Sequence, residues 1–142
     1  MASAESCTGG LVGHVITQIP KSSDHYLGGI VSYSNAVKEE LLDVPADLLE
    51  RVGAVSAEVA EAMTAGTLAR FPVASLVVAV TGVAGPDGGS DEKPVGLTYV
   101  AAAVRDGPAV VERHTWPHDR DGNKRASALA AIELATRLTT GE

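Results

Sequence analysis

The pattern of hydrophobic and polar positions divides the chain into alternating strands and helices. Apolar runs over 27–33, 74–81 and 95–104 predict strands, and the last two are nearly continuous, which is typical of strands covered on both faces. Residues 110–116 alternate apolar and polar side chains and predict an exposed edge strand. Residues 1–5 leave room for only the end of a strand.

Helices are expected between these strands, and serines mark the start of two of them. Ser34, or Asn35 beside it, and Ser56 are suitable N-cap residues because their side chains accept hydrogen bonds from the first helical turn. In the last helix, Ala128, Ala131 and Ala135 lie along one apolar stripe. The expected helices cover residues 10–19, 35–42, 45–52, 57–70 and 121–138.

The order of these elements predicts a single α/β domain over residues 1–142. A three-layer α/β/α arrangement around a mixed, mostly parallel sheet is expected, because helices alternate with buried strands. The chain shows no internal repeat, low-complexity tract or linker, and its 142 residues fit one domain.

Composition narrows the classes of function. Eleven basic residues face 18 acidic ones and aromatic residues make up 4%, so nucleic-acid binding is disfavoured. Cys7 is the only cysteine and the four histidines are scattered, so neither a disulfide framework nor a metal site is expected. No signal peptide and no apolar run of 18 residues is present, which predicts a cytoplasmic protein without membrane association.

The segment Glu5-Ser-Cys-Thr-Gly-Gly10 is the first candidate site. Ser6, Cys7 and Thr8 are three adjacent potential nucleophiles, and the glycines after them allow backbone N–H groups to approach a ligand. The alternative is a helix cap followed by tight packing at the glycines. Spacing alone does not choose between these alternatives or among the three side chains.

Two further segments follow predicted strands and carry candidate chemistry. Lys38 lies in the first turn of its helix, where burial would favour a neutral amine able to act as a base; the alternative is an ordinary surface lysine. The glycine-rich segment 81–90, with Lys93 beyond it, suits a phosphate or ribose; the alternative is a mobile connector. Ligands of open α/β sheets bind at the carboxyl ends of strands, so all three segments could meet in one crevice.

Several motifs together identify a resemblance. The stretches AESCTGGLVG, GGIVSYSNAVK, GAVSAEVAEAM and AVTGVAGPDGGSDEKPVG, followed by a late Asp-Arg pair, resemble the CinA carboxy-terminal domain family through nearly the whole chain. The enzymatic members of this family are nicotinamide-nucleotide amidohydrolases, which serve pyridine nucleotide salvage. The resemblance implies hydrolysis of the carboxamide of nicotinamide mononucleotide to nicotinate mononucleotide and ammonia, with no cofactor.

The resemblance also assigns roles to residues. It implies that Ser6 is the nucleophile, that Lys38 takes its proton, and that Tyr33 relays the proton or orients the amine. The N–H groups of the turn would hold the oxyanion, and the glycine-rich loop would bind the phosphate together with Lys93 and Arg120. The implied substrate-binding set is Thr8, Gly9, Gly10, Asn35, Gly82, Gly85, Gly88, Gly89, Lys93 and Arg120.

The chain departs from the family pattern in two places. Asn123 and Lys124 stand where an apolar residue and an arginine usually follow the Asp-Arg pair. The helix and most of a strand that usually precede the Ser6 turn are missing, which would leave apolar surface near residues 1–5. That surface and the edge strand over 110–116 lead us to expect a homo-oligomer.

Two alternative functions stay open, namely a non-catalytic nucleotide-binding module and an amidase for another small amide.

Overall fold

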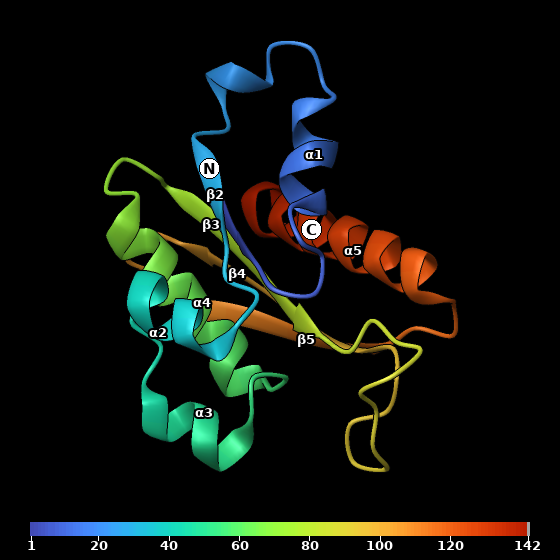
Figure 1. Cartoon of the computed structure of the whole chain (residues 1–142). Helices are drawn as coiled ribbons and strands as arrows, with labels where there is room; N and C mark the ends of the chain where they lie inside the picture. The colour runs from blue at the N-terminus through green and yellow to red at the C-terminus, as the bar shows by residue number, and fades with distance from the viewer. Residues whose placement is uncertain (142) are drawn as a thin grey trace.

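A five-stranded sheet forms the middle layer of the domain, in the order β2-β1-β3-β4-β5. The computed structural model describes residues 1–141 (Figure 1). The strand β1 pairs in parallel with β2 and β3, whereas β4 is antiparallel to both β3 and β5. Four strands therefore point the same way and β4 opposes them, as expected for a mixed, mostly parallel sheet. The strands are β1 (Ala2–Glu5), β2 (Gly28–Val31), β3 (Leu76–Gly82), β4 (Leu97–Val104) and β5 (Ala109–Thr115).

Helices cover both faces of the sheet, which confirms the three-layer expectation. The helices α1 and α5 pack on one face, and α4, with α2 and α3 against it, packs on the other (Figure 1). The helices are α1 (Leu11–Thr17), α2 (Asn35–Leu42), α3 (Ala46–Val52), α4 (Ala57–Arg70) and α5 (Arg120–Thr140), and a short 3₁₀ turn covers Ser22–Asp24.

The predicted serine caps explain why the bounds of α2 and α4 agree with the sequence pattern. Ser34 accepts a hydrogen bond from Val37 N, and Ser56 accepts one from Val59 N, both at 3.2 Å. Each bond satisfies an N–H group that the first turn of a helix leaves without a partner. The predicted alanine stripe of α5 is also confirmed, because Ala128, Ala131 and Ala135 are buried against the sheet.

The first strand is buried more deeply than the sequence predicted. Ala2 and Ala4 are fully buried, since β1 lies between β2 and β3 in the centre of the sheet. The expectation of uncovered apolar surface at residues 1–5 is therefore wrong. The small side chains of β1 form no apolar run, so the sequence pattern did not indicate a strand in the centre of the sheet.

Gly66 allows close contact between α4 and α2. A Cβ at this position would lie 2.0 Å from the carbonyl oxygen of Leu42. Gly66→Ala is therefore expected to lower the free energy of unfolding by about 1–3 kcal/mol through overpacking, although alanine ordinarily favours a helix. Urea denaturation measures this change. The exposed neighbour Ala65 provides a control, because Ala65→Gly should cost no more than about 1 kcal/mol. Equal or greater stability of Gly66→Ala would contradict the contact.

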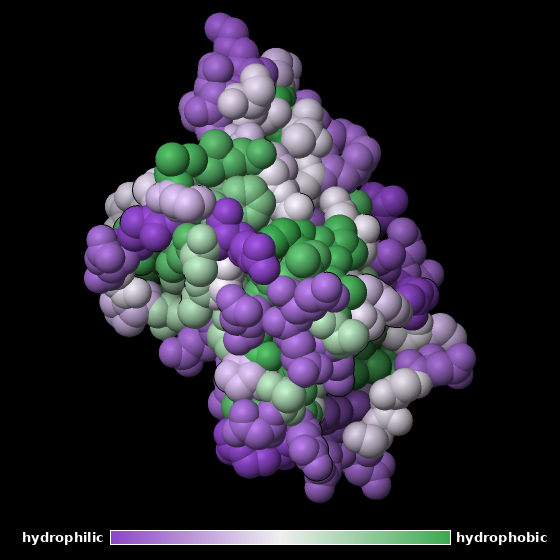
Figure 2. Space-filling view, turned by 60° about the vertical axis from the view of Figure 1, so that its left-hand side comes forward, coloured by the Kyte–Doolittle hydropathy of each residue, from purple (hydrophilic) through white to green (hydrophobic). Residues whose placement is uncertain are grey.

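Both edges of the sheet expose side chains. The strand β5 is an edge strand as predicted, with Val110 exposed, and β2 forms the other edge with Val31 exposed. Apolar patches on the face seen in Figure 2 are interrupted by polar side chains. Self-association stays a prediction. Within residues 1–141, no helix combines the length and the apolar character needed to cross a membrane.

Candidate functional site

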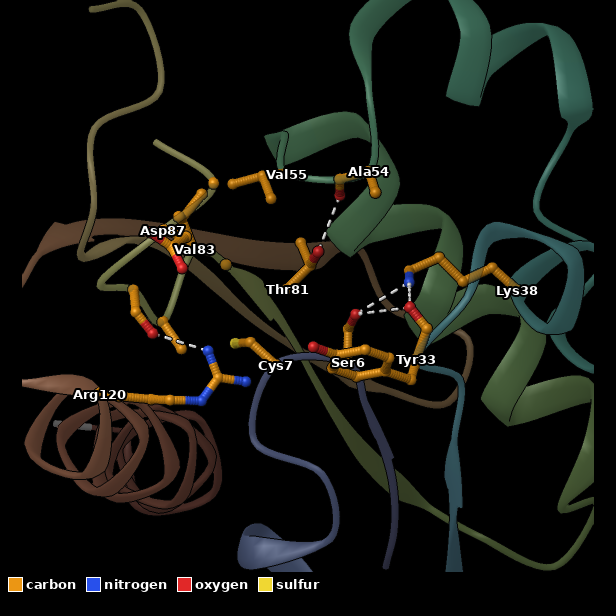
Figure 3. Close-up of a pocket in the computed structure, with 14 residues that line it drawn as sticks. Ser6, Cys7, Tyr33, Lys38, Ala54, Val55, Thr81, Val83, Asp87 and Arg120 are labelled. Carbon is orange, nitrogen blue, oxygen red and sulfur yellow. Dashed lines mark hydrogen bonds between the residues drawn. The ribbon is translucent and has the colours of Figure 1, made fainter. Parts of the chain in front are cut away.

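The strand order creates a crevice at the carboxyl ends of β1 and β3. The chain leaves β1 towards β2 on one side and later returns to β3 on the other side, which is the kind of reversal where open α/β sheets bind ligands. A cavity of about 330 Å³ lies there (Figure 3). It unites all three predicted segments and also the start of α5. Its lining consists of Ser6, Cys7, Tyr33, Lys38, Ala54, Val55, residues 81–85, Asp87, Gly88 and Arg120.

Ser6 and Lys38 form a direct contact inside this cavity. The Nζ of Lys38 lies 2.9 Å from the Oγ of Ser6, and it donates to the carbonyl oxygens of Ser32 at 2.7 Å and Tyr33 at 3.0 Å. The Lys38 side chain is fully buried (0% exposed), so it is not a surface lysine. The segment between β2 and α2 wraps around the amine and supplies both carbonyls (Figure 3).

The surroundings of Lys38 make its amine easier to deprotonate than that of an exposed lysine. Burial lowers the pKa of Lys38 to about 8. Within residues 1–141, no carboxylate forms an ion pair with it. A neutral amine has two N–H donors, which match the carbonyls of Ser32 and Tyr33. In the structure Nζ donates to Ser6 Oγ, and the Ser6 hydroxyl donates to the Tyr33 carbonyl at 3.5 Å. Once the amine is neutral, its lone pair can replace that donor at the same 2.9 Å distance and take the serine proton.

Cys7 and Tyr33 differ from Ser6 in what their side chains contact. Cys7 is buried, and burial raises the pKa of its thiol to about 11, which keeps it protonated and a poor nucleophile. The Tyr33 side chain is 63% exposed and lines the cavity. Its hydroxyl forms no hydrogen bond within the described part of the chain, so Tyr33 orients the Lys38 amine through its backbone carbonyl.

Glu5 is an essential part of the turn that sequence reasoning missed. Its carboxylate is 2% exposed. It accepts hydrogen bonds from the Thr8 hydroxyl at 2.6 Å and from the N–H groups of Gly10, Val12 and Gly13 at 3.2, 2.8 and 3.2 Å. The N-cap residue of α1 contributes no side-chain bond. Glu5 therefore caps this helix and fixes the turn that carries the candidate nucleophile.

This capping changes the expected oxyanion donors. The N–H of Gly10 is bound to Glu5, and the N–H of Gly9 donates to the carbonyl of Ser6 at 3.1 Å. These glycines and Thr8 do not line the cavity. The expectation that Gly9 and Gly10 supply free N–H groups to a ligand is therefore wrong, because the chain uses both donors itself.

Glu5→Ala is expected to lower the free energy of unfolding by at least about 3 kcal/mol. The change leaves one hydroxyl and three N–H groups without their acceptor, and each buried unsatisfied donor costs about 1–3 kcal/mol. Urea denaturation at pH 7 measures the loss. Glu39→Ala, at an exposed position of α2, is the control and should change stability by less than about 0.5 kcal/mol. Similar stabilities of the two variants would contradict this role of Glu5.

The glycine-rich loop contributes only part of the predicted set. Gly82, Gly85 and Gly88 line the cavity, whereas Gly89 and Asn35 do not. Lys93 is also outside the lining.

The amine of Lys93 instead donates to the carbonyl of Val52, the last residue of α3. A cation is favourable there because the carboxyl end of a helix carries partial negative charge. Lys93 thus fastens the loop to α3, and its predicted phosphate contact is replaced by this structural contact.

The first turns of α5 form the remaining wall. Arg120 lines the cavity as predicted, and its Nη1 donates to the carbonyl of Gly85 at 2.7 Å. Asn123 is buried, and its Nδ2 donates to the carbonyl of Ala84 at 2.9 Å, so this departure from the family pattern ties the loop to α5. The amine of Lys124 lies 3.8 Å from where a Cβ on Gly9 would stand.

Thr81 is a second residue that sequence reasoning missed. Its hydroxyl donates to the carbonyl of Ala54 at 2.8 Å and holds the connection between α3 and α4 against the cavity (Figure 3). A hydroxyl at the end of an otherwise apolar strand was the available signal. Among residues 1–141, no group of three or more His, Cys, Asp or Glu side chains is arranged to hold a metal ion.

Comparison with known proteins places this site in a family. The model of the CinA C-terminal domain matches residues 1–139. The chain belongs to the CinA C-terminal domain family. It is 49% identical over 136 residues to a CinA-like protein of Parasynechococcus marenigrum, covering 95% of this chain and 32% of that protein. A CinA-like protein of Mycolicibacterium vanbaalenii is 46% identical over 141 residues, and the match covers 99% of this chain and 33% of that protein. The chain thus spans about a third of these CinA-like relatives.

Solved structures of the CinA superfamily share the fold. The competence/damage-inducible protein of Agrobacterium tumefaciens superposes with a TM-score of 0.92 at 38% identity, covering 97% of this chain and 84% of that one. The CinA superfamily protein of Escherichia coli gives a TM-score of 0.91 at 29% identity, and the match covers 96% of this chain and 78% of that one. The mixed sheet and its two helical layers are therefore those of the CinA superfamily.

Proposed function

We propose that this CinA domain is a serine amidohydrolase that converts nicotinamide mononucleotide to nicotinate mononucleotide and ammonia. One observation carries the proposal, namely the buried contact of 2.9 Å between Lys38 Nζ and Ser6 Oγ. The substrate comes from the resemblance to the nicotinamide-nucleotide amidohydrolases. The chemistry comes from the serine and lysine, a pairing that serves as nucleophile and base on unrelated folds.

The reaction begins with proton transfer from Ser6 to Lys38. The Ser6 oxygen attacks the carboxamide carbon, and the carbonyl oxygen becomes an oxyanion. The N–H group of Cys7 is suited to stabilise it, because Cys7 lines the cavity and its N–H donates to no other residue within residues 1–141. The protonated Lys38 donates this proton to the amide nitrogen of the tetrahedral intermediate, the carbon–nitrogen bond breaks, and ammonia leaves an ester on Ser6. Water, with Lys38 again as base, then hydrolyses the ester on Ser6 and releases nicotinate mononucleotide.

Arg120 is the residue we assign to the phosphate of the substrate. The formal charge of the protein is −7, so an anionic ligand needs a local cation. Arg120 lines the cavity and uses one nitrogen for Gly85, while a guanidinium carries five N–H donors in all. Its unused donors are suited to a phosphate group.

A coupled ammonia assay on the purified protein tests the proposed function. Nicotinamide mononucleotide should release ammonia faster than free nicotinamide or the dinucleotide does. Tight nucleotide binding without ammonia would favour the alternative of a non-catalytic nucleotide-binding module. Release of ammonia from an unrelated small amide, and none from the mononucleotide, would favour the second alternative, an amidase for another small amide.

Arg120→Ala is expected to raise KM for nicotinamide mononucleotide by about 10- to 100-fold. Charge-assisted hydrogen bonds contribute about 1.5–3 kcal/mol each, and every 1.4 kcal/mol is a factor of ten. The riboside, which lacks the phosphate, should lose much less. Steady-state kinetics on both compounds measure the difference. Arg125→Ala is the matched control, because Arg125 is exposed on the same helix and pairs with Asp121. Equal losses for both compounds would remove Arg120 from the phosphate site.

A further inference from the structure

The hydroxyl of Thr81 lies beside the candidate nucleophile. The N–H of Ser6 donates to the carbonyl of Val80 at 2.9 Å, so Ser6 and Thr81 are side by side where the parallel strands β1 and β3 end. Both residues line the cavity, and Figure 3 shows Thr81 between Ala54 and Ser6. A ligand whose reacting carbon meets the Ser6 oxygen therefore comes close to the Thr81 oxygen.

The single hydrogen of the Thr81 hydroxyl already has an acceptor. Thr81 Oγ1 donates to the carbonyl of Ala54 at 2.8 Å, and the residue is 1% exposed. A hydroxyl has one O–H donor and two acceptor lone pairs. Within residues 1–141, Thr81 Oγ1 accepts no hydrogen bond, so its lone pairs remain for a ligand in the cavity.

Two other oxygen acceptors near Ser6 are engaged by the protein itself. The carbonyls of Ser32 and Tyr33 accept hydrogen bonds from Lys38 Nζ at 2.7 and 3.0 Å. These contacts hold the amine next to the nucleophile. The Thr81 oxygen is therefore the acceptor beside Ser6 that is suited to an N–H group of a ligand.

We propose that Thr81 is a specificity residue that accepts a hydrogen bond from the NH2 group of the carboxamide. This inference rests on the proposed function and adds the group that recognises the amide nitrogen. A ketone or an ester of the same shape has no N–H to donate at this position. To donate to such a ligand instead, Thr81 would have to leave the Ala54 carbonyl without its partner. The site should therefore favour a primary amide over both.

A purely structural role of Thr81 has a different consequence. Loss of its bond to Ala54 would loosen the connection between α3 and α4 and weaken the binding of all ligands alike. A specificity role weakens only the ligands that carry an N–H group beside the reacting carbon. The ratio of two affinities therefore separates the two roles.

The experiment compares two mononucleotides that differ in one small group. Ser6→Ala protein is titrated by calorimetry with nicotinamide mononucleotide and with acetylpyridine mononucleotide, in which a methyl group replaces NH2. The charge, the ring, the ribose and the phosphate are the same in both. The amide should bind about 5- to 20-fold more tightly, which is the range for one hydrogen bond to a buried acceptor.

Three variants in the Ser6→Ala background locate the source of that preference. Thr81→Ser keeps the hydroxyl and should keep the ratio. Thr81→Val has nearly the same shape but no acceptor, so the two affinities should become nearly equal. Thr67→Val is the matched control, because the buried Thr67 hydroxyl also donates to a backbone carbonyl, that of Met63 at 2.6 Å, but does not line the cavity. It should leave the ratio unchanged.

The outcomes separate this inference from the proposed function. Ammonia release by the wild-type protein together with equal affinities for the amide and the ketone would overturn the role of Thr81 alone. This comparison needs no change at Thr81, so it stands even where Thr81→Val does not fold. A preference for the amide that Thr81→Val preserves would also overturn that role. A preference that Thr81→Val abolishes, without ammonia release by the wild-type protein, would support the role of Thr81 and overturn the hydrolytic function.

Discussion

Lys38→Met is expected to lower kcat for amide hydrolysis by about 10²- to 10⁴-fold, which is the usual contribution of a positioned general base. Methionine is similar in length and fills the same buried space, but it has no lone pair on nitrogen to take the proton of Ser6. Stopped or continuous ammonia assays at saturating substrate measure the effect. Nearly normal turnover in this variant would require a different base.

Lys38→Arg is the matched control for charge. A guanidinium retains donors for the carbonyls of Ser32 and Tyr33 but stays protonated, so Lys38→Arg should be as inactive as Lys38→Met.

The free energy of unfolding of Lys38→Met should remain within about 2 kcal/mol of wild type. The loss of three hydrogen bonds lowers stability, whereas removal of a buried amine raises it, so the two effects partly cancel.

The pH dependence of kcat/KM follows from the same residue. Since the folded-state pKa of Lys38 is about 8, below the ordinary value of 10.5, activity should rise as the pH increases through about 8. Linkage gives the matching effect on stability. The unfolded chain binds more protons than the folded chain between about pH 8 and 10.5, so this residue makes the fold more stable as the pH rises through that range.

Ser6→Ala is expected to reduce turnover by at least about 10⁴-fold, because the reaction loses its nucleophile. Binding should stay within about threefold, since only one hydroxyl is removed and the cavity is otherwise unchanged. Kinetics and calorimetry on the same preparation measure both effects. Cys7→Ala is the control for the neighbouring thiol and should remain at least about 100-fold more active than Ser6→Ala. If Cys7→Ala were instead the inactive variant, the nucleophile would be the cysteine.

The sequence predicted the elements whose ends are determined locally. Ser34 and Ser56 fixed the starts of α2 and α4, and continuous apolar runs revealed β3 and β4. The central position of β1 was not predictable in the same way. Its four residues, Ala-Ser-Ala-Glu, carry no strong pattern, and their burial comes from two parallel neighbours that are distant in sequence.

The sequence predicted the location of the site more accurately than the contacts of its residues. Strand ends brought Ser6, Lys38 and the glycine-rich loop to one cavity, as expected. The partners of Glu5 and Lys93 depend on the three-dimensional path of the chain. A carboxylate at a strand end usually meets water, and a lysine near glycines usually suggests a phosphate. Here both side chains bind helix ends of the protein itself.

The Glu5 carboxylate also has a consequence for competition by salts. It occupies the amino end of α1, and the remaining N–H of that turn, from Leu11, donates to the carbonyl of Thr8. Dissolved phosphate or sulfate therefore has no vacant donors to bind there and cannot displace a carboxylate held on its own strand. Arg120, an exposed cation in the lining of the cavity, remains available to such ions. Buffer anions should thus compete with the phosphate of a nucleotide while leaving attack on a small uncharged amide unaffected.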